Sequence, residues 1–460
     1  MLVQEDTIAA IATPKGVGGI GIIRISGPKA EEIGHRLFKP KKYSSPLQSH
    51  YLYYGTIVSL DGGAILDEVL LSIMRKPHSY TGEDTIEINC HGGPVVVETV
   101  LHEVLKAGSR LAEPGEFTKR AYLNGRLDLA QAEAVIDLIM AQSNRGLSLA
   151  LSHLRGNVSI KVQSLRSSLI KILAHLETLI DFTEEDIDIP PSAEFSNTIR
   201  LIIDDIEGIL ATYSEGKTVR DGLSIIITGK PNVGKSSLLN RLLGEKRAII
   251  TPVPGTTRDF IEEALLIKGI PIKLVDTAGI RYVQDQIEAE GIKLVWEKIS
   301  SADVVIILLD GSTCITEEDM EVIDKNKGKE IILVINKSDL PSQIKDNDLE
   351  KIIPGVGPLW ISAKYGDGIP QLTEKIYELT MNNKQTTESD VMLSNLRHKV
   401  AFEKARDLLT IAYNTMIQGL SPELTAFDIK ESLEYLGDII GETTNEDVLD
   451  RIFSTFCIGK

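Results

Sequence analysis

The sequence predicts a multidomain protein of mixed class, with an N-terminal α+β domain, a discontinuous helical domain and an α/β domain inserted into the helical one. Three observations support this. The chain has 460 residues, too many for one compact core, since domains usually hold ~100–200 residues. Its hydrophobic spacing changes several times along the chain. Its apolar and charged fractions, 42% and 25%, are those of an ordinary globular protein.

Residues 1–119 form the predicted α+β domain. Short apolar runs bounded by turn residues predict strands at 20–25, 51–58, 69–73 and 85–89. Between 97 and 105, apolar residues recur three and four positions apart, which predicts one amphipathic helix.

Residues 120–219 and 383–460 form the two predicted pieces of the helical domain. Leucine and isoleucine at 165, 169, 172, 176 and 179 form the seam of a long helix. An acidic segment at 181–191 interrupts this piece and is predicted as a loop. After a polar linker at 382–390, helical stripes return at 429–440 and 448–456. A single helical domain with an insertion is the more compact reading, and two separate helical domains are the alternative.

Residues 220–382 form the predicted α/β domain. Buried-strand candidates rich in isoleucine, leucine and valine lie at 224–228, 272–275, 304–309 and 331–335 and alternate with helical stretches. Such segments are typical of parallel strands that are buried on both faces.

Charge and cysteine content exclude several classes of protein. The net charge is −17, which argues against a protein held on nucleic acid by bulk charge, so an RNA partner would need a local patch or a second protein. Three cysteines are too few for a disulfide framework and favour a reducing cytoplasm. No apolar stretch approaches the ~20 residues of a membrane span, so no membrane partner is expected.

The segment from Gly229 to Ser236 has the pattern of a phosphate-binding loop. It follows a predicted strand and opens a predicted helix, so backbone N–H groups and the helix N-terminus would surround a phosphate. We expect Lys235 to neutralise the β- and γ-phosphates and Ser236 to bind Mg²⁺.

A second motif identifies the base. Asn336-Lys-Ser-Asp339 follows a predicted strand, and its aspartate can accept hydrogen bonds from N1–H and the amino group of guanine. Ser362-Ala-Lys364 would lie on the other side of the base. The two motifs together predict a GTP site.

The hydrolytic part of this site is only partly specified. Asp276-Thr-Ala-Gly279 ends a strand and would hold Mg²⁺ through water, and Thr256 or Thr257 would complete the metal shell. Ile280 stands where Ras-type GTPases have a glutamine that orients the attacking water. From chemistry alone, Asp285, Glu288 and Glu290 remain equal candidates for that role.

Segments throughout the chain are similar to signatures of the MnmE (TrmE) family of tRNA-modification GTPases. They are Asp6–Ala10, Gly18–Gly27, Tyr80–Glu87, Pro114–Asn124, Leu127–Glu133 and the tail Phe456–Lys460. The GTP motifs alone fit many GTPases, whereas the flanking segments make the resemblance specific.

The resemblance implies a K⁺-stimulated GTP hydrolase that works with an FAD-dependent MnmG-type partner. Together they would add a carboxymethylaminomethyl or aminomethyl group to C5 of the wobble uridine, U34, of certain tRNAs. The one-carbon unit would come from 5,10-methylene-tetrahydrofolate, with 5-formyl-tetrahydrofolate as an analogue. The resemblance also implies a folate-binding N-terminal domain that dimerises, a TrmE-type G domain of Ras-like fold, and a heterotetramer with the partner in the cytoplasm.

The resemblance assigns further residues of the GTP site. K⁺ would bind Asn232, Thr256 and the carbonyls of Thr251 and Val253, while Thr257 joins Ser236 on Mg²⁺ and Glu288 orients the water. The GTP site then comprises Asn232, Val233, Gly234, Lys235, Ser236, Ser237, Thr251, Pro252, Val253, Pro254, Gly255, Thr256, Thr257, Asp276, Thr277, Ala278, Gly279, Asn336, Lys337, Asp339, Ser362, Ala363 and Lys364.

The resemblance also assigns a folate site to Arg24, Glu87, Arg126 and Lys460. Cys457 is either a catalytic thiol or a buried structural one. The alternative function is a switch of the ribosome-assembly type, which would need neither the tail nor the folate residues. A folate-binding scaffold whose partner performs the chemistry is a third reading.

Overall fold

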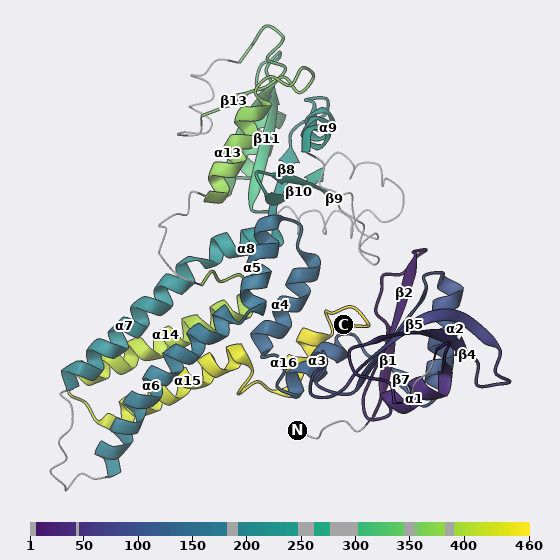
Figure 1. Ribbon diagram of the computed structural model, residues 1–460. Coiled ribbons are helices and arrows are strands. Elements are labelled where there is room, and N and C mark those ends of the chain that lie inside the picture. The colour runs from purple at the N-terminus through teal and green to yellow at the C-terminus, as the bar shows by residue number, and fades with distance from the viewer. Residues whose placement is uncertain are drawn as a thin grey trace, which may run out of the picture. The chain divides into compact units, whose positions relative to one another are not determined.

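The computed structural model describes residues 6–42, 46–181, 192–246, 262–276, 302–344, 355, 357–381 and 391–460 (Figure 1). They form two compact units. The first comprises residues 1–136, 153–200 and 404–460, and the second comprises residues 137–152 and 201–403. Of the loop predicted at 181–191, Asp181 is the last residue of α6 and the rest lies outside the described residues, as does the linker predicted at 382–390. No helix in the described part of the chain has the length and apolar character to cross a bilayer.

The first unit begins with a seven-stranded sheet in the order β3-β4-β5-β6-β2-β1-β7. All neighbours are antiparallel except β1 and β7. The predicted strands are confirmed as β2, β4, β5 and β6, whereas β1, β3 and β7 were not predicted. The bounds are β1 Ile8–Ile11, β2 Ile20–Ser26, β3 Phe38–Pro40, β4 Leu52–Val58, β5 Ile65–Met74, β6 Thr85–His91 and β7 Arg110–Leu111.

Helices α1 (Ala30–Leu37) and α2 (Pro94–Lys106) pack against this sheet. The predicted amphipathic helix is confirmed as α2, whose Val97, Val100 and Val104 lie in the sheet's hydrophobic core. In α1, a Cβ on Gly34 would lie 2.3 Å from Cδ1 of Ile86, so glycine permits a close approach of the helix to the sheet.

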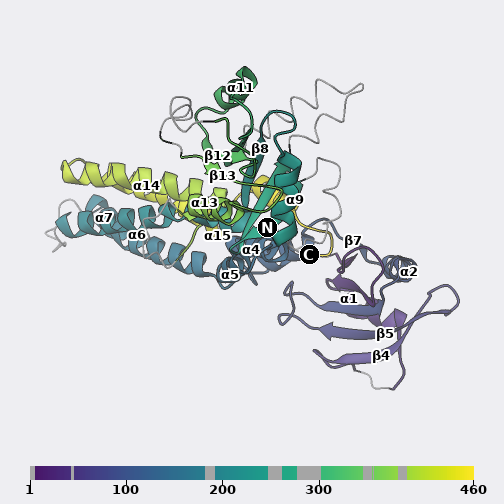
Figure 2. The ribbon, with the colours of Figure 1, turned by 90° about the horizontal axis from the view of Figure 1, so that it is seen from above.

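The helical part of the first unit joins segments that are distant in sequence. Helix α6 (Asn157–Asp181) packs against α15 (Pro422–Ile440), and Figures 1 and 2 both show them side by side. Leu165, Leu169 and Leu176 of the predicted seam are buried in α6. Because these helices lie on either side of the α/β segment in the sequence, that segment interrupts a single packed structure. The domain boundaries after residues 119, 219 and 382 remain a prediction.

The other helices complete the description of both units. They are α3 Glu116–Leu123, α4 Leu129–Met140, α5 Asn144–Leu154, α7 Ser192–Ala211, α8 Tyr213–Asp221, α14 Leu396–Ile417 and α16 Glu446–Phe453. The apolar stripe predicted at 448–456 extends beyond its helix, because α16 ends at Phe453. Phe456 nevertheless packs with Leu449 and Phe453 in one hydrophobic cluster.

The second unit contains a six-stranded sheet in the order β13-β12-β11-β8-β10-β9. Only the β9–β10 pair is antiparallel, as in Ras-like G domains. The four predicted strands are confirmed as β8, β10, β11 and β12. The bounds are β8 Leu223–Thr228, β9 Glu262–Ile267, β10 Ile270–Asp276, β11 Val304–Asp310, β12 Glu330–Asn336 and β13 Leu359–Trp360.

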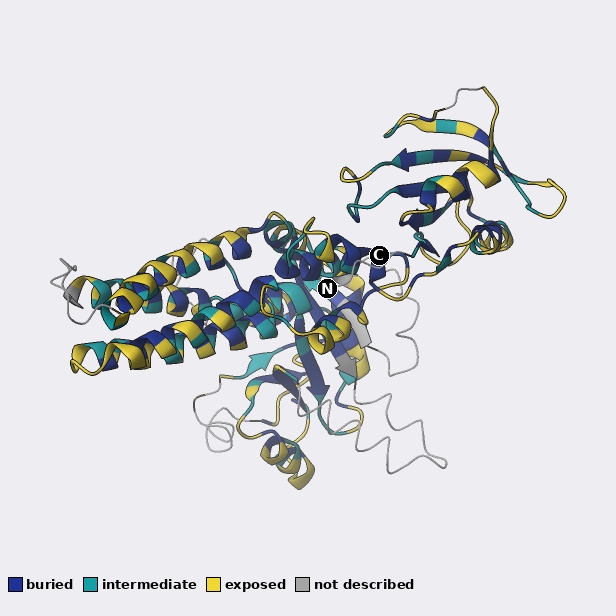
Figure 3. Ribbon diagram, turned by 90° about the horizontal axis from the view of Figure 1, so that it is seen from below, coloured by how far each residue is buried: buried dark blue, intermediate teal, exposed yellow. Residues whose placement is uncertain are grey.

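Helices cover both faces of this sheet. Helices α9 (Lys235–Lys246) and α13 (Ile369–Met381) share one apolar cluster with it, and α11 (Glu317–Lys325) contributes Ile323 to another. Strand β11 is buried at every position, in keeping with the dark blue core of Figure 3. In such folds, ligands bind where the parallel strands end.

Candidate functional site

The phosphate-loop motif lies between β8 and α9, as predicted. Its backbone passes through left-handed conformations at Asn232 (φ +64°) and Gly234 (φ +102°). A Cβ on Gly229 would lie 2.4 Å from the carbonyl oxygen of Leu308, so only glycine fits there. The loop therefore has the tight turn that a phosphate-binding loop requires.

Lys235 begins α9, and its side chain points back over the loop. Its Nζ donates to the carbonyl oxygens of Gly229 and Lys230, each at 2.9 Å. Ser236 and Ser237 follow in the first turn of α9, where both are exposed. A cationic group, a hydroxyl and a helix N-terminus thus meet at one place.

Asn336 connects the base motif to the phosphate loop. It is the last residue of β12 and is 3% exposed. Its Nδ2 donates to the carbonyl oxygen of Val233 at 2.7 Å, and its Oδ1 accepts from the N–H of Ala363 at 2.9 Å. Ser362 Oγ donates to Asp339 Oδ1 at 2.6 Å. The structure therefore brings together the three motifs that sequence reasoning assigned to GTP.

The structure adds Asp310 to this group. Lys337 has a left-handed backbone (φ +65°), and its Nζ lies 2.5 Å from Asp310 Oδ2 at the end of β11. Burial raises the pKa of Asp310, but hydrogen bonds from Lys337 and Ser312 outweigh this and hold the pKa below its ordinary value. Lys364 contributes its carbonyl oxygen to a hydrogen bond from Arg241. Sequence reasoning missed Asp310, although an acid ending a buried strand was a usable signal.

Several predicted residues of the GTP site lie outside the described residues. They are Thr251, Pro252, Val253, Pro254, Gly255, Thr256, Thr257, Thr277, Ala278, Gly279 and Glu288. Asp276 is the last residue of β10, and it pairs with Ile227 of β8 immediately before the phosphate loop. This backbone position agrees with the predicted place near the phosphates.

A second polar site lies in the first unit, on the sheet. Arg24 of β2 and Glu87 of β6 are register partners, and Arg24 Nη2 lies 2.8 Å from Glu87 Oε1. The guanidinium carbon of Arg24 lies 5.5 Å from the ring centre of Tyr80 and 5.7 Å from that of Phe117. Cation–π attraction operates at such distances. Sequence reasoning did not single out the two aromatic residues, although both lie within the signature segments.

The tail Phe456–Lys460 lies against the same site. Arg24 Nη1 donates to the carbonyl oxygen of Gly459 at 3.2 Å, and a Cβ on Gly459 would lie 2.3 Å from the carbonyl oxygen of Ile11. Burial lowers the pKa of Lys460, and Arg24 lowers it further, against the opposing effect of Glu87 and Cys457. The structure therefore brings Arg24, Glu87 and Lys460 together, as the folate assignment expects.

Cys457 and Arg126 complete the inventory of that site. Cys457 is exposed, so the alternative of a buried structural thiol is wrong. Its carbonyl oxygen accepts from the N–H groups of Gly115 at 3.4 Å and Lys460 at 3.3 Å, which holds the tail. Arg126 Nε donates to the carbonyl oxygen of Ser79 at 3.2 Å, next to Tyr80, rather than to Arg24's partners.

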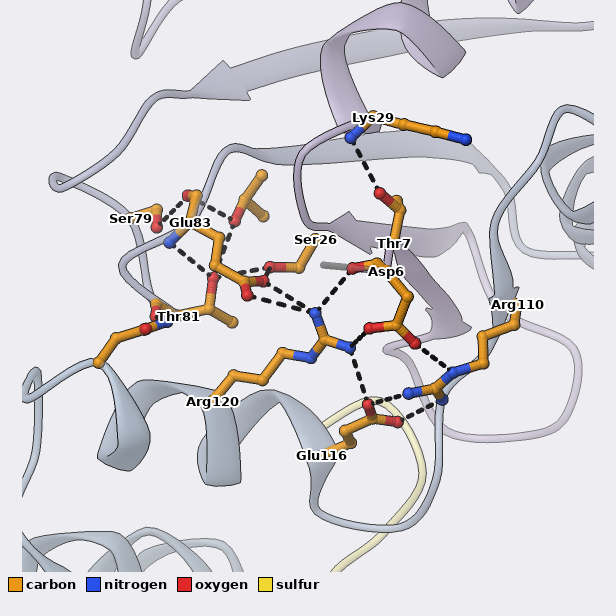
Figure 4. A network of polar contacts seen from close by, with 12 residues as sticks. Asp6, Thr7, Ser26, Lys29, Ser79, Thr81, Glu83, Arg110, Glu116 and Arg120 are labelled. Carbon is orange, nitrogen blue, oxygen red and sulfur yellow. Dashed lines mark hydrogen bonds and ion pairs between the residues drawn. The ribbon is translucent and has the colours of Figure 1, made fainter. Parts of the chain in front are cut away.

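A charge network links Glu83, which follows Ser79 and Thr81 in one turn, to α3 and to Asp6 (Figure 4). Arg120 of α3, whose side chain is 4% exposed, forms ion pairs with Asp6 at 2.7 Å, Glu116 at 2.9 Å and Glu83 at 3.2 Å. Arg110 pairs with the same Asp6 and Glu116, at 2.6 and 2.5 Å. The network joins three of the signature segments, which contain Asp6, Glu83 and Arg120.

In this structure a phosphate loop follows a central parallel strand and is linked to an Asn-Lys-Ser-Asp guanine motif. This combination defines a GTP-binding protein with a Ras-like G domain. Two family models match the chain, "GTP-binding protein TrmE N-terminus" over residues 7–126 and "MnmE helical domain" over residues 129–457. The chain belongs to the MnmE family of tRNA modification GTPases.

Curated relatives match over the whole length. The tRNA modification GTPase MnmE of Syntrophus aciditrophicus is 53% identical over 456 residues, covering 99% of this chain and 100% of the relative. The MnmE of Acetivibrio thermocellus is 45% identical over 457 residues, with the same coverage. Among solved structures, Aquifex aeolicus Era is 28% identical in a match that covers 40% of this chain and 67% of Era, with a TM-score of 0.28.

Proposed function

We propose that this protein is a K⁺-stimulated GTPase that acts in the cytoplasm with an MnmG-type FAD protein on U34 of certain tRNAs. The pair would add the carboxymethylaminomethyl or aminomethyl group to C5 of that uridine. The observation that carries the proposal is the full-length similarity to tRNA modification GTPases, at 53% identity in one relative. Family membership also counts against the ribosome-assembly alternative.

Nucleoside mass spectrometry of tRNA tests this function. Cells that lack the gene should lose the C5-modified wobble uridine and regain it with the wild-type gene. Complementation with Lys235→Ala should fail, because that variant removes the cation over the phosphate loop. An unchanged nucleoside profile in the deletion strain would contradict the proposal.

The cation sites are proposed around the phosphate loop. Asn232 is exposed at the left-handed turn of the loop, which suits a K⁺ ligand that also approaches the phosphates. Thr251, Val253 and Thr256 would complete the K⁺ shell, and Ser236 with Thr257 would hold Mg²⁺. Hydrolysis should be at least about tenfold faster in K⁺ than in Na⁺, and Asn232→Ala should abolish the difference. Asn240→Ala, which changes an exposed asparagine of α9, is the matched control.

Glu288 is proposed to orient the attacking water in place of the missing glutamine. Glu288→Ala should leave GTP affinity unchanged and reduce kcat by about a hundredfold or more. Single-turnover hydrolysis at saturating GTP measures this directly. A rate equal to that of the wild type would remove Glu288 from the mechanism.

The second site is proposed to bind 5,10-methylene-tetrahydrofolate through Arg24, Glu87, Arg126 and Lys460. A carboxylate such as Glu87 can accept two hydrogen bonds from the amino-pyrimidinone edge of a pterin, and the basic residues suit its glutamyl carboxylates. Calorimetry with 5-formyl-tetrahydrofolate should show at least about tenfold weaker binding for Glu87→Gln. Glu98→Gln, at an exposed position of α2, should bind normally.

Cys457 is proposed as a reactive thiol of the modification step, since its exposure leaves the sulfur accessible beside the folate residues. Cys457→Ser should lose tRNA modification while its thermal unfolding and GTP hydrolysis stay normal. Retained modification would contradict the catalytic role.

The assembly is proposed to be a homodimer that binds two MnmG-type chains and tRNA. Family membership implies this partnership. Light scattering on the protein alone, and then with the partner, should report a dimer and a heterotetramer. A monomer that hydrolyses GTP at the full K⁺-stimulated rate would contradict the proposed dimer.

A further inference from the structure

Lys230 is the second residue of the phosphate loop, and its side chain is directed away from the loop. Its Nζ lies 2.9 Å from Asp319 Oδ2, in α11. The side chains of Lys230 and Asp319 are 16% and 3% exposed, so the pair is largely shielded from water. Asp319 therefore neutralises the charge of Lys230.

Asp319 is itself held in place at the start of α11. Its Oδ2 also accepts from the backbone N–H of Thr316 at 3.0 Å and from the Thr316 hydroxyl at 2.8 Å. Its Oδ1 is buried and has no hydrogen-bond partner among the described residues. Ile323, one turn further along α11, packs into the cluster beneath the sheet. Lys230 is therefore attached to a fixed element of the fold.

The same residue touches Lys235 through its main chain, since the Lys230 carbonyl oxygen accepts from Lys235 Nζ at 2.9 Å. Asn336 holds the other end of the loop, at the carbonyl of Val233. The loop is thus anchored at two points, one from the base motif and one from α11. A loop that is fixed before the ligand arrives loses less conformational entropy on binding.

We propose that Lys230 is a positioning residue, which holds the phosphate loop in its binding conformation through Asp319 and so sets the affinity for guanine nucleotides. This inference rests on the G-domain site and not on the tRNA chemistry. It concerns binding rather than the hydrolytic step, because the two side chains bond to each other and hold the loop.

Equilibrium binding of fluorescent GDP and of a non-hydrolysable GTP analogue to the full-length protein tests the proposal. Lys230→Met should raise both Kd values about tenfold, equivalent to ~1.4 kcal/mol, with kcat at saturating GTP changed less than about threefold. Asp319→Asn should have a similar effect. The double variant should be no weaker than the worse single one, because both changes break the same pair. Lys230→Arg should restore binding to within about threefold of the wild type.

Glu318→Gln is the matched control, because it removes an exposed negative charge from the first turn of α11 and leaves Lys230, Asp319 and Thr316 in place. It should lower the melting temperature slightly but leave both Kd values unchanged. If Lys230→Met does not fold, as judged by circular dichroism, Lys230→Gln replaces it in the same measurements.

Three outcomes would overturn the proposal. Unchanged affinity in Lys230→Met would make the pair purely structural. Weaker binding in Lys230→Met but not in Asp319→Asn would mean that Lys230 contacts the nucleotide itself. An equal loss in Glu318→Gln would assign the effect to the stability of α11.

Discussion

Two glycines with nearly the same backbone conformation differ in what surrounds them. Gly115 has φ +69° and Gly125 has φ +68°. A Cβ on Gly115 would lie 2.5 Å from the carbonyl oxygen of Phe453, whereas a Cβ on Gly125 would meet nothing within 4 Å. The two glycines therefore differ in the room available for a side chain and not in backbone strain.

Alanine at each position should therefore destabilise the protein to different extents. Gly125→Ala should lower the free energy of unfolding by about 1 kcal/mol, the cost of a left-handed residue. Gly115→Ala adds steric overlap and should lower it by about 2–4 kcal/mol. Urea unfolding compares the two, and equal losses would show that the contact between Gly115 and α16 carries no energy.

Asp339 is the residue that we propose to determine which base the site accepts. Asparagine at this position would present an amide N–H where guanine also donates, whereas xanthine offers a carbonyl at C2. Asp339→Asn should therefore bind xanthosine triphosphate better than GTP, with affinity for GTP reduced at least about tenfold. Ser338→Ala, at the exposed neighbouring position, should keep the preference for GTP.

Ion pairs of Glu116 with Arg110 and Arg120 hold helix α3 in the first unit. Burial raises the pKa of Glu116, but hydrogen bonds from Arg110 and Arg120 outweigh it and hold the pKa below its ordinary value of 4.5. A carboxyl whose folded pKa is depressed stabilises the fold above its unfolded pKa and loses that contribution as pH falls through the folded value. The stabilisation should therefore fade below about pH 4.5.

The free energy of unfolding, measured from pH 7 to pH 3, tests this expectation. Wild-type protein and Glu98→Gln should lose stability together below pH 4.5, whereas Glu116→Gln should start lower and fall less steeply. Parallel curves for all three proteins would show that Glu116 does not contribute.

Elements with a strong apolar period were predictable from the sequence, and weakly patterned ones were not. Helices α2 and α6 carry regular apolar stripes, and strands β8, β10, β11 and β12 are rich in isoleucine, leucine and valine. Strand β1 was not predicted because Ala9 and Ala10 weaken its hydrophobic pattern. Strands β3 and β7 were not predicted because they are only three and two residues long.

The same distinction applies to the sites. The phosphate loop and the Asn-Lys-Ser-Asp motif are local in sequence, so their chemistry is visible there. Asp310, the Lys230–Asp319 pair and the aromatic rings beside Arg24 are contacts between distant segments. No spacing rule predicts such contacts, which follow from the packing of strands and helices.

At the scale of the whole molecule, the two sites should respond to mutation independently. Gly459 has φ +95° and meets Ile11, whereas Gly108 has φ +115° and open space around it. Gly459→Ala should displace the tail and weaken binding of 5-formyl-tetrahydrofolate about tenfold or more, with GTP hydrolysis unchanged. Gly108→Ala should bind the folate normally, and a fall in GTPase rate in Gly459→Ala alone would show that the tail also acts on the G domain.

The packing of α6 against α15 also sets an order of events during protein synthesis. The ribosome synthesises α6 and then the entire G domain before α15 emerges. The apolar side chains of α6, which include Leu165 and Leu169, therefore lack α15 during that time. At typical elongation rates of ~5–20 residues per second, that interval lasts on the order of ten seconds or more. During this interval α6 lacks one of the helices that cover its apolar side chains in the finished protein.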